Sequence, residues 1–170
     1  MKKALALFAA VIIASAITAC SSSESNTAST ASSITNTSST SSKPNPADKI
    51  VQQIKDDRKK WNKLVDSELP SIAKEKDKEK MINKLNTTIS WCDKESDYFL
   101  AAADTKGISD KQKQACLDIK TGLYGAESSC FKPMLKVFKG SSSSVPENYN
   151  EYLGTATDYI KKAYDAVKWD

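Results

Sequence analysis

The spacing of apolar residues constrains the fold of this chain more than any other feature of its sequence. From Ala47 onward, apolar side chains recur every three or four residues, about 3.5 on average. Residues at this spacing lie on one stripe of an α-helix, so they predict helices that bury a narrow face against one another. No stretch alternates convincingly with period two, and we expect no sheet.

The pattern divides into four helical segments, at about 47–73, 78–104, 109–137 and 147–169. Ser109 and Gln112 have the spacing of a capping box at the start of the third segment. Gly107 and Gly140 stand where the second and third helices should end in a left-handed cap. Short connections favour antiparallel neighbours, so the sequence predicts an all-α, antiparallel four-helix bundle.

The third segment is the least certain part of this pattern. Gly122, Gly125 and Pro133 all disfavour a helix interior, so a break near Gly122 to Gly125 would give five helices instead of four. The apolar stripe nevertheless runs through all three positions. We therefore predict one continuous, kinked helix here, and we expect Pro70 to kink or shorten the first helix.

The N-terminal residues have the features of an export signal. Met1-Lys2-Lys3 precedes an apolar run that ends at Ile17, which is too short to be a membrane span of about 20 residues. The following residues, Ile17-Thr18-Ala19-Cys20, resemble the lipobox of bacterial lipoproteins. This resemblance implies cleavage before Cys20, attachment of diacylglycerol to its thiol and acylation of the new N-terminus, with palmitate as a typical acyl chain. It places the protein outside the cytoplasm, lipid-anchored to the cell membrane or the outer membrane.

A polar segment separates the anchor from the helices. Between Ser21 and Ser42, 16 of 22 residues are Ser or Thr. Such a composition buries too little apolar surface to offset the entropy of ordering, so we expect disorder. The sequence thus predicts a signal peptide at 1–19, the lipidated cysteine and a disordered tether at 20–46, and a helical-bundle domain at 47–170.

The other three cysteines all fall on the apolar stripes, at Cys92, Cys116 and Cys130. On one continuous helix Cys116 and Cys130 would be about 21 Å apart, which no disulfide can bridge. We expect any disulfide to join Cys92 to Cys116, with Cys130 as the alternative partner. The thiols have no CxxC pair and the chain has no histidine, so we predict no metal site and no cofactor.

The composition excludes several kinds of chemistry. Without histidine there is no Ser-His or Cys-His nucleophile, and the five glycines do not fit a phosphate-binding loop. The acidic run 93–97 lacks the glycine and the final glutamate of a calcium loop, so we interpret it as a solvated helix face. Lysines on the first helix are interleaved with acidic residues, which argues against nucleic acid as a partner. We predict no catalytic residue.

These features lead to a functional hypothesis. We expect a lipid-anchored envelope protein whose bundle is a non-catalytic binding or adaptor module for an unidentified envelope protein or polymer. Tyr152, Tyr159 and Trp169 are candidate contact residues, although packing at the edge of the bundle explains them equally well. The alternatives are a surface immunity or exclusion factor and an envelope enzyme that uses carboxylates.

Overall fold

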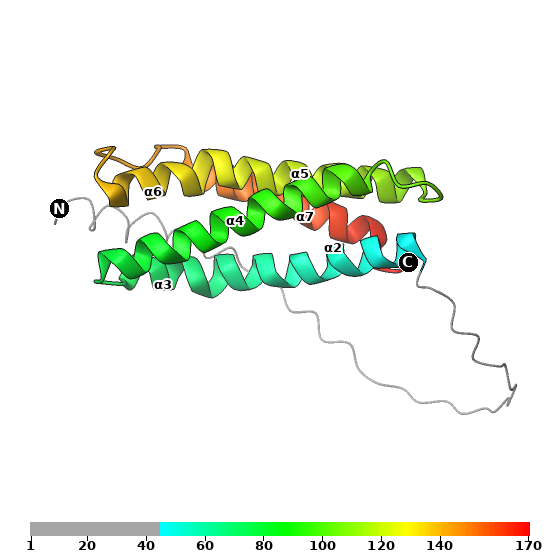
Figure 1. Cartoon of the computed structure of the whole chain (residues 1–170), viewed down its shortest axis with the longest axis horizontal. Coiled ribbons are helices and arrows are strands. Elements are labelled where there is room, and N and C mark those ends of the chain that lie inside the picture. The colour runs from blue at the N-terminus through cyan, green and yellow to red at the C-terminus, as the bar shows by residue number, and fades with distance from the viewer. Residues whose placement is uncertain (1–44) are drawn as a thin grey trace, which may run out of the picture.

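Four helical rods lie alongside one another in the part of the chain that the computed structural model describes, residues 45–170 (Figure 1). Cys20 and the Ser/Thr-rich segment lie outside these residues. The rods are, in chain order, α2 (Pro46–Lys63), η1 (Leu64–Glu68) and α3 (Leu69–Lys74) as the first; α4 (Lys78–Ala102) as the second; α5 (Asp110–Ala126), η2 (Glu127–Phe131) and α6 (Lys132–Lys139) as the third; and α7 (Tyr149–Val167) as the fourth. The described part contains no strand, and the predicted all-α four-helix bundle is confirmed.

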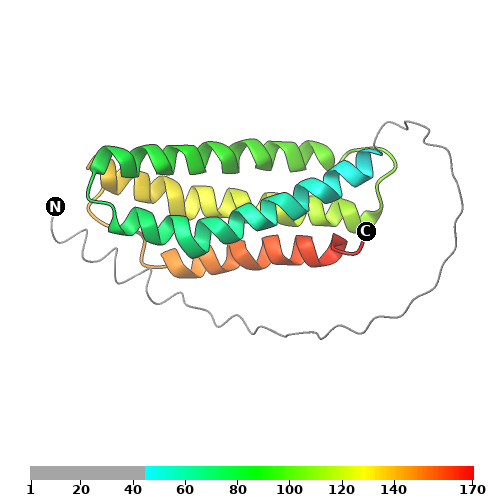
Figure 2. The same cartoon turned by 90° about the horizontal axis from the view of Figure 1, so that it is seen from below.

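Successive rods run in opposite directions, as the two perpendicular views show (Figures 1 and 2). Residue 45, the loop 103–109 and the C-terminus share one end of the bundle, and the loops 75–77 and 140–148 share the other. The core between the rods contains fully buried large side chains such as Trp61, Phe99 and Phe131. No helix of the described part is long and apolar enough to cross a membrane.

Local sequence sets where the helices begin and end. Ser109 and Gln112 form the predicted capping box, in which each side chain bonds the other residue's backbone N–H. Gly140 ends α6 with a φ of 81°. Gly107 also has a positive φ, of 85°, but the C-cap of α4 is Ala103, so Gly107 shapes the following loop instead of capping the helix.

The third rod is continuous from Asp110 to Lys139, which makes the five-helix alternative wrong. Gly122 faces α7 at close range: a Cβ atom there would lie 2.8 Å from the carbonyl oxygen of Ala156 and 2.9 Å from Cγ1 of Ile160. A Cβ on Gly125 would meet nothing within 4 Å. Gly122 therefore allows two helices to approach each other and does not break one.

Both prolines inside the long rods follow a π-helical turn. Pro70 comes two residues after η1 and Pro133 two residues after η2. In each turn a backbone N–H bonds the carbonyl five residues back, from Leu69 to Leu64 and from Lys132 to Glu127. A proline ring collides with the carbonyl four residues back in a regular α-helix, and the wider turn relieves that collision. The rods therefore continue past the prolines.

The bundle consists of two helical hairpins that share a plan but pack differently. Each has a long rod with a π-turn and a proline, followed by a straight helix. In the second hairpin α5 and α7 pack closely through Gly122, and α4 packs on α5. In the first hairpin α2 has its closest backbone neighbours in α7 and α5. Between α2 and α4, the Gln53–Glu95 hydrogen bond and the Lys60–Trp91 contact bridge a wider gap between the backbones. The open side of the bundle is thus the one between the first rod and α4.

Candidate functional site

Polar side chains line this open side, which we call the α2/α4 seam. Starting from the end that holds residue 45, Gln53 and Asp57 of α2 face Glu95 of α4. The next contact is between Lys60 and Trp91. Beyond it, η1 and α3 border a groove whose other wall is the first half of α4.

Two buried carboxyl groups meet at the first of these contacts. Asp57 is 3% exposed and Glu95 is 9% exposed. The Gln53 amide joins them: its Nε2 donates to Oδ1 of Asp57 at 3.3 Å and to Oε2 of Glu95 at 3.2 Å. The second oxygen of Asp57, Oδ2, is buried and makes no well-aligned hydrogen bond. In the described part of the chain no lysine or arginine forms an ion pair with either carboxyl group.

This environment makes Asp57 an unusually weak acid. Burial raises its pKa to about 7, and repulsion from Glu95 adds to the increase. The Gln53 amide, the Trp91 indole and the Lys60 ammonium oppose the increase but do not cancel it. The Asp57 carboxyl therefore gains and loses its proton close to neutral pH, where an ordinary aspartate is fully ionised.

Lys60 and Trp91 separate the carboxyl pair from the groove. The Nζ atom of Lys60 lies 4.3 Å from the centroid of the Trp91 ring, a cation–π distance. Trp91 is 8% exposed, so the pair covers the seam at this point. Lys60 also lowers the pKa of Asp57, so its ammonium group interacts with both the Asp57 carboxyl group and the Trp91 ring.

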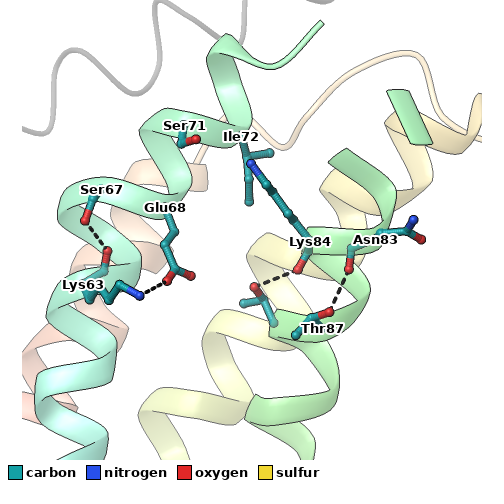
Figure 3. Close-up of a pocket in the computed structure, with 9 residues that line it drawn as sticks. Lys63, Ser67, Glu68, Ser71, Ile72, Asn83, Lys84 and Thr87 are labelled. Atoms are coloured by element: carbon teal, nitrogen blue, oxygen red, sulfur yellow. Dashed lines mark hydrogen bonds and ion pairs between the residues drawn. The ribbon is translucent and has the colours of Figure 1, made fainter. Parts of the chain in front are cut away.

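The groove has a volume of about 590 Å³, which lies within the range of small-molecule sites (Figure 3). Its walls carry hydroxyl, amide and charged side chains around Ile72. The lining residues are Lys63, Ser67, Glu68, Ser71 and Ile72 from the first rod, and Asn83, Lys84, Thr87 and Thr88 from α4.

Three hydroxyl groups of the groove already use their protons within their own helices. Ser67 donates to the Lys63 carbonyl at 2.9 Å, Thr87 to the Asn83 carbonyl at 3.0 Å, and Thr88 to the Lys84 carbonyl at 3.0 Å (Figure 3). Their oxygen atoms keep free lone pairs, so they can accept hydrogen bonds but not donate them. A matching ligand would therefore bring N–H or O–H groups of its own.

The charges at the groove are balanced. Lys63 pairs with Glu68 at 3.1 Å (Figure 3). Lys84 reaches across from α4 to Glu75, with its Nζ 3.9 Å from Oε2. The first pair joins residues five apart, which the π-turn η1 brings onto one face. Aliphatic atoms make up most of the groove surface, its charges are paired and its lining has no aromatic ring, so the groove suits a ligand of low net charge.

Another buried acid, Glu127, lies in the core at η2. Glu127 is 1% exposed, and its Oε1 is paired with the ammonium group of Lys132. Burial raises the pKa of the Cys92 thiol, and the negative charge of Glu127 raises it further. A thiol held protonated in this way is a poor nucleophile, so Cys92 is placed for packing and not for attack.

The three predicted cysteines are buried and free in the structure. Burial raises the pKa of Cys116 to about 11 and that of Cys130 to about 12. The expected pairing of Cys92 with Cys116 stays a prediction. The described residues contain no group of three His, Cys, Asp or Glu side chains that could hold a metal ion.

Peptide mapping of the exported protein without reduction should show no crosslink between Cys116 and Cys130. The two residues are 14 positions apart on one continuous rod, which separates their Cα atoms by about 21 Å. Mapping after reduction and alkylation supplies the control digest. A Cys116–Cys130 crosslink would require the chain to reverse between them and would contradict the observed fold.

The remaining sequence candidates do not gather into a site. Asp93 and Asp97 are exposed on α4, as expected for a solvated face, but Glu95 between them is buried. Tyr152, Tyr159 and Trp169 are exposed. Their role as contact residues stays a prediction.

Sequence reasoning missed Asp57 and Glu95, although their spacing carried a signal. Asp57 comes three residues after Ile54 and four before Trp61, and both of these side chains are fully buried. Glu95 comes three residues after Cys92 and four before Phe99, which are also fully buried. Both acids therefore occupy apolar-stripe positions where a hydrophobic residue is normally found.

No family model, curated protein or solved structure matches the chain, so the interpretation of the site rests on its own geometry.

Proposed function

We propose that this chain is a lipid-anchored bacterial envelope protein whose helical bundle binds a polar ligand, without catalysis, in the groove of the α2/α4 seam. The observation that carries the proposal is the groove itself, with its unused acceptor oxygens and its balanced charges. The ligand it suits is rich in N–H or O–H donors and has little net charge, as an oligosaccharide does.

The position of the groove supports this role. Its lining residues on the first rod lie about 26 to 39 Å from Pro46, measured as helical rise. The anchor at Cys20 precedes Pro46 in the chain, so the groove lies at the end of the domain remote from the point where the anchoring segment joins.

An enzyme that uses carboxylates is the weaker alternative. Asp57 and Glu95 do face each other, but neither lines the groove, and Asp57 is almost completely buried. Acid–base catalysis requires the carboxyl group to reach the substrate within hydrogen-bond distance. The two acids are better placed to affect the packing of α2 against α4 than to contact a substrate.

Titrating the ¹⁵N-labelled protein with a panel of defined neutral oligosaccharides tests the proposal. We expect at least one of them to shift the amide signals of Ser67, Ser71, Thr87 and Thr88 selectively. Ser71→Trp should abolish the shifts by filling the groove, whereas Thr155→Trp, an exposed change on α7, should leave them intact. A panel without any response, or a response that survives Ser71→Trp, would contradict the proposal.

Replacing Cys20 by Ser should release the protein from membranes. Each buried methylene of an acyl chain contributes about 0.8 kcal/mol to membrane affinity, and the described helices offer no membrane span in its place. Labelling of cells with a fatty acid, followed by fractionation, measures both the modification and its consequence. Label or membrane retention that persists in the variant would contradict the lipid anchor.

A further inference from the structure

We propose that Asp57 and Glu95 form a proton-operated joint between α2 and α4, which keeps the α2/α4 seam closed while Asp57 holds a proton and lets it open when Asp57 loses that proton. The inference rests on the proposed function, because it concerns the width of the same groove. It begins from geometry: two buried carboxyl groups on opposite helices share one Gln53 amide and no ion pair.

One amide cannot satisfy two carboxylates. Its Nε2 already donates to both acids, and the buried Oδ2 of Asp57 makes no well-aligned hydrogen bond, although the Trp91 indole is near enough to act on the carboxyl group. A proton on one of the acids removes one negative charge and adds a hydrogen-bond donor at the place where the seam lacks one. Without this proton two like charges face each other in a site from which water is largely excluded, and they repel.

The charged and titratable groups around Asp57 do not neutralise a doubly ionised pair. From α4 it is faced by Glu95, and the Cys92 thiol and the Tyr98 hydroxyl also sense its charge. Glu127 of η2 acts on the same Cys92, but its own charge is paired with Lys132. Among residues 45–170, Lys60 on α2 itself is the cation that acts on Asp57, and it lies over Trp91.

Lys60 connects the joint to the groove. Along α2, Asp57 precedes the first groove residue, Lys63, by about 9 Å, and along α4, Glu95 follows Thr88 by about 10 Å. When Asp57 ionises, Lys60 is drawn from the Trp91 ring toward the new carboxylate. The contact that covers the seam between the joint and the groove then weakens, and the helices are free to separate by a small hinge movement.

The open packing of this hairpin lowers the free-energy cost of such a movement. The backbones of α5 and α7 are locked by the close approach at Gly122, but α2 and α4 have no comparable contact. Separation of α2 from α4 therefore leaves the tight interface of the second hairpin intact.

Distance measurements between spin labels test the joint on the full lipidated chain in detergent micelles. Nitroxides on Ser71→Cys and Asn83→Cys would report the width of the groove, because the native Cys92, Cys116 and Cys130 thiols are fully buried and should not be labelled. Between pH 5.5 and pH 8.5 we expect the mean distance to increase by about 2 Å, the size of a typical helix shift. We also expect the change to follow the ¹³C titration of the Asp57 carboxyl group.

The variants separate the joint from a general effect of pH. Asp57→Asn and Glu95→Gln should each hold the distance at its low-pH value throughout, and Asp56→Asn, an exposed neighbour on α2, should behave as the wild type. A distance that does not change with pH in the wild type, or that changes equally in Asp57→Asn, would overturn the joint. No ligand is present, so an oligosaccharide panel without response would count against the proposed function and leave this result standing.

Discussion

Replacing Gly122 by Ala is expected to lower the free energy of unfolding by about 3 kcal/mol, the upper part of the range for overpacked cores. The new methyl group would lie 2.8 Å from the Ala156 carbonyl oxygen, a backbone atom that cannot turn away as a side chain can. Relief requires α5 and α7 to move apart, and this loosens the most closely packed interface of the bundle. Urea denaturation followed by far-UV circular dichroism measures the loss.

Gly125→Ala is the matched control, three residues further along the same helix. Nothing lies within 4 Å of the methyl group that it would add, so only the higher helix propensity of alanine remains. We expect this change to raise the free energy of unfolding by about 0.5 to 1 kcal/mol. If both variants changed stability in the same direction, the close approach at Gly122 would not be what sets α5 against α7.

The second large effect is the dependence of stability on pH that Asp57 introduces. Its pKa is raised from 3.8 to about 7, so the folded protein binds this proton more tightly than the unfolded chain does. The protonated Asp57 carboxyl adds to the free energy of unfolding. This contribution is fully present below pH 4 and is lost as the pH rises through 7. A difference of about three pKa units corresponds to about 4 kcal/mol lost by pH 9.

Asp57→Asn should recover this loss, because the amide resembles the protonated carboxyl group and cannot ionise. At pH 9 the variant should be more stable than the wild type by up to about 4 kcal/mol, and at pH 4 the two should be nearly equal. Asp56→Asn should not reproduce the gain, because Asp56 is exposed. Parallel stability curves for wild type and Asp57→Asn between pH 4 and pH 9 would contradict the raised pKa.

The helices were predictable from the sequence because their signals are local. The period of the apolar residues indicates where the helical segments lie, and the Ser109–Gln112 pair marks the start of the third to within one residue. The role of Gly122 could not be predicted from its neighbours in the sequence. Its low helix propensity indicates a weak point, but its effect depends on α7, more than 30 residues further along the chain.

The site was less predictable, for a related reason. Asp57 and Glu95 stand in charged stretches that look like solvated helix faces, and only the assembled bundle turns them toward each other. The groove likewise depends on how far α4 stands from the first rod, a distance that no residue pattern within one helix encodes. Gln53 gave no signal of its own, since an amide on a helix is ordinary until two carboxyl groups lie beside it.

The π-turn η1 divides the first rod into two parts whose side chains are rotated relative to each other about the helix axis. A π-turn is equivalent to one residue inserted into an α-helix, so every side chain after Glu68 is rotated by about 100° relative to a rod without it. The buried positions record this shift, because five residues separate Leu64 from Leu69 where three or four would be usual. Ser71 and Ile72, which line the groove, follow the π-turn, whereas Asp57 and Lys60 precede it. The chemistry of the groove wall can therefore change with the length of this turn while the carboxyl pair keeps its place.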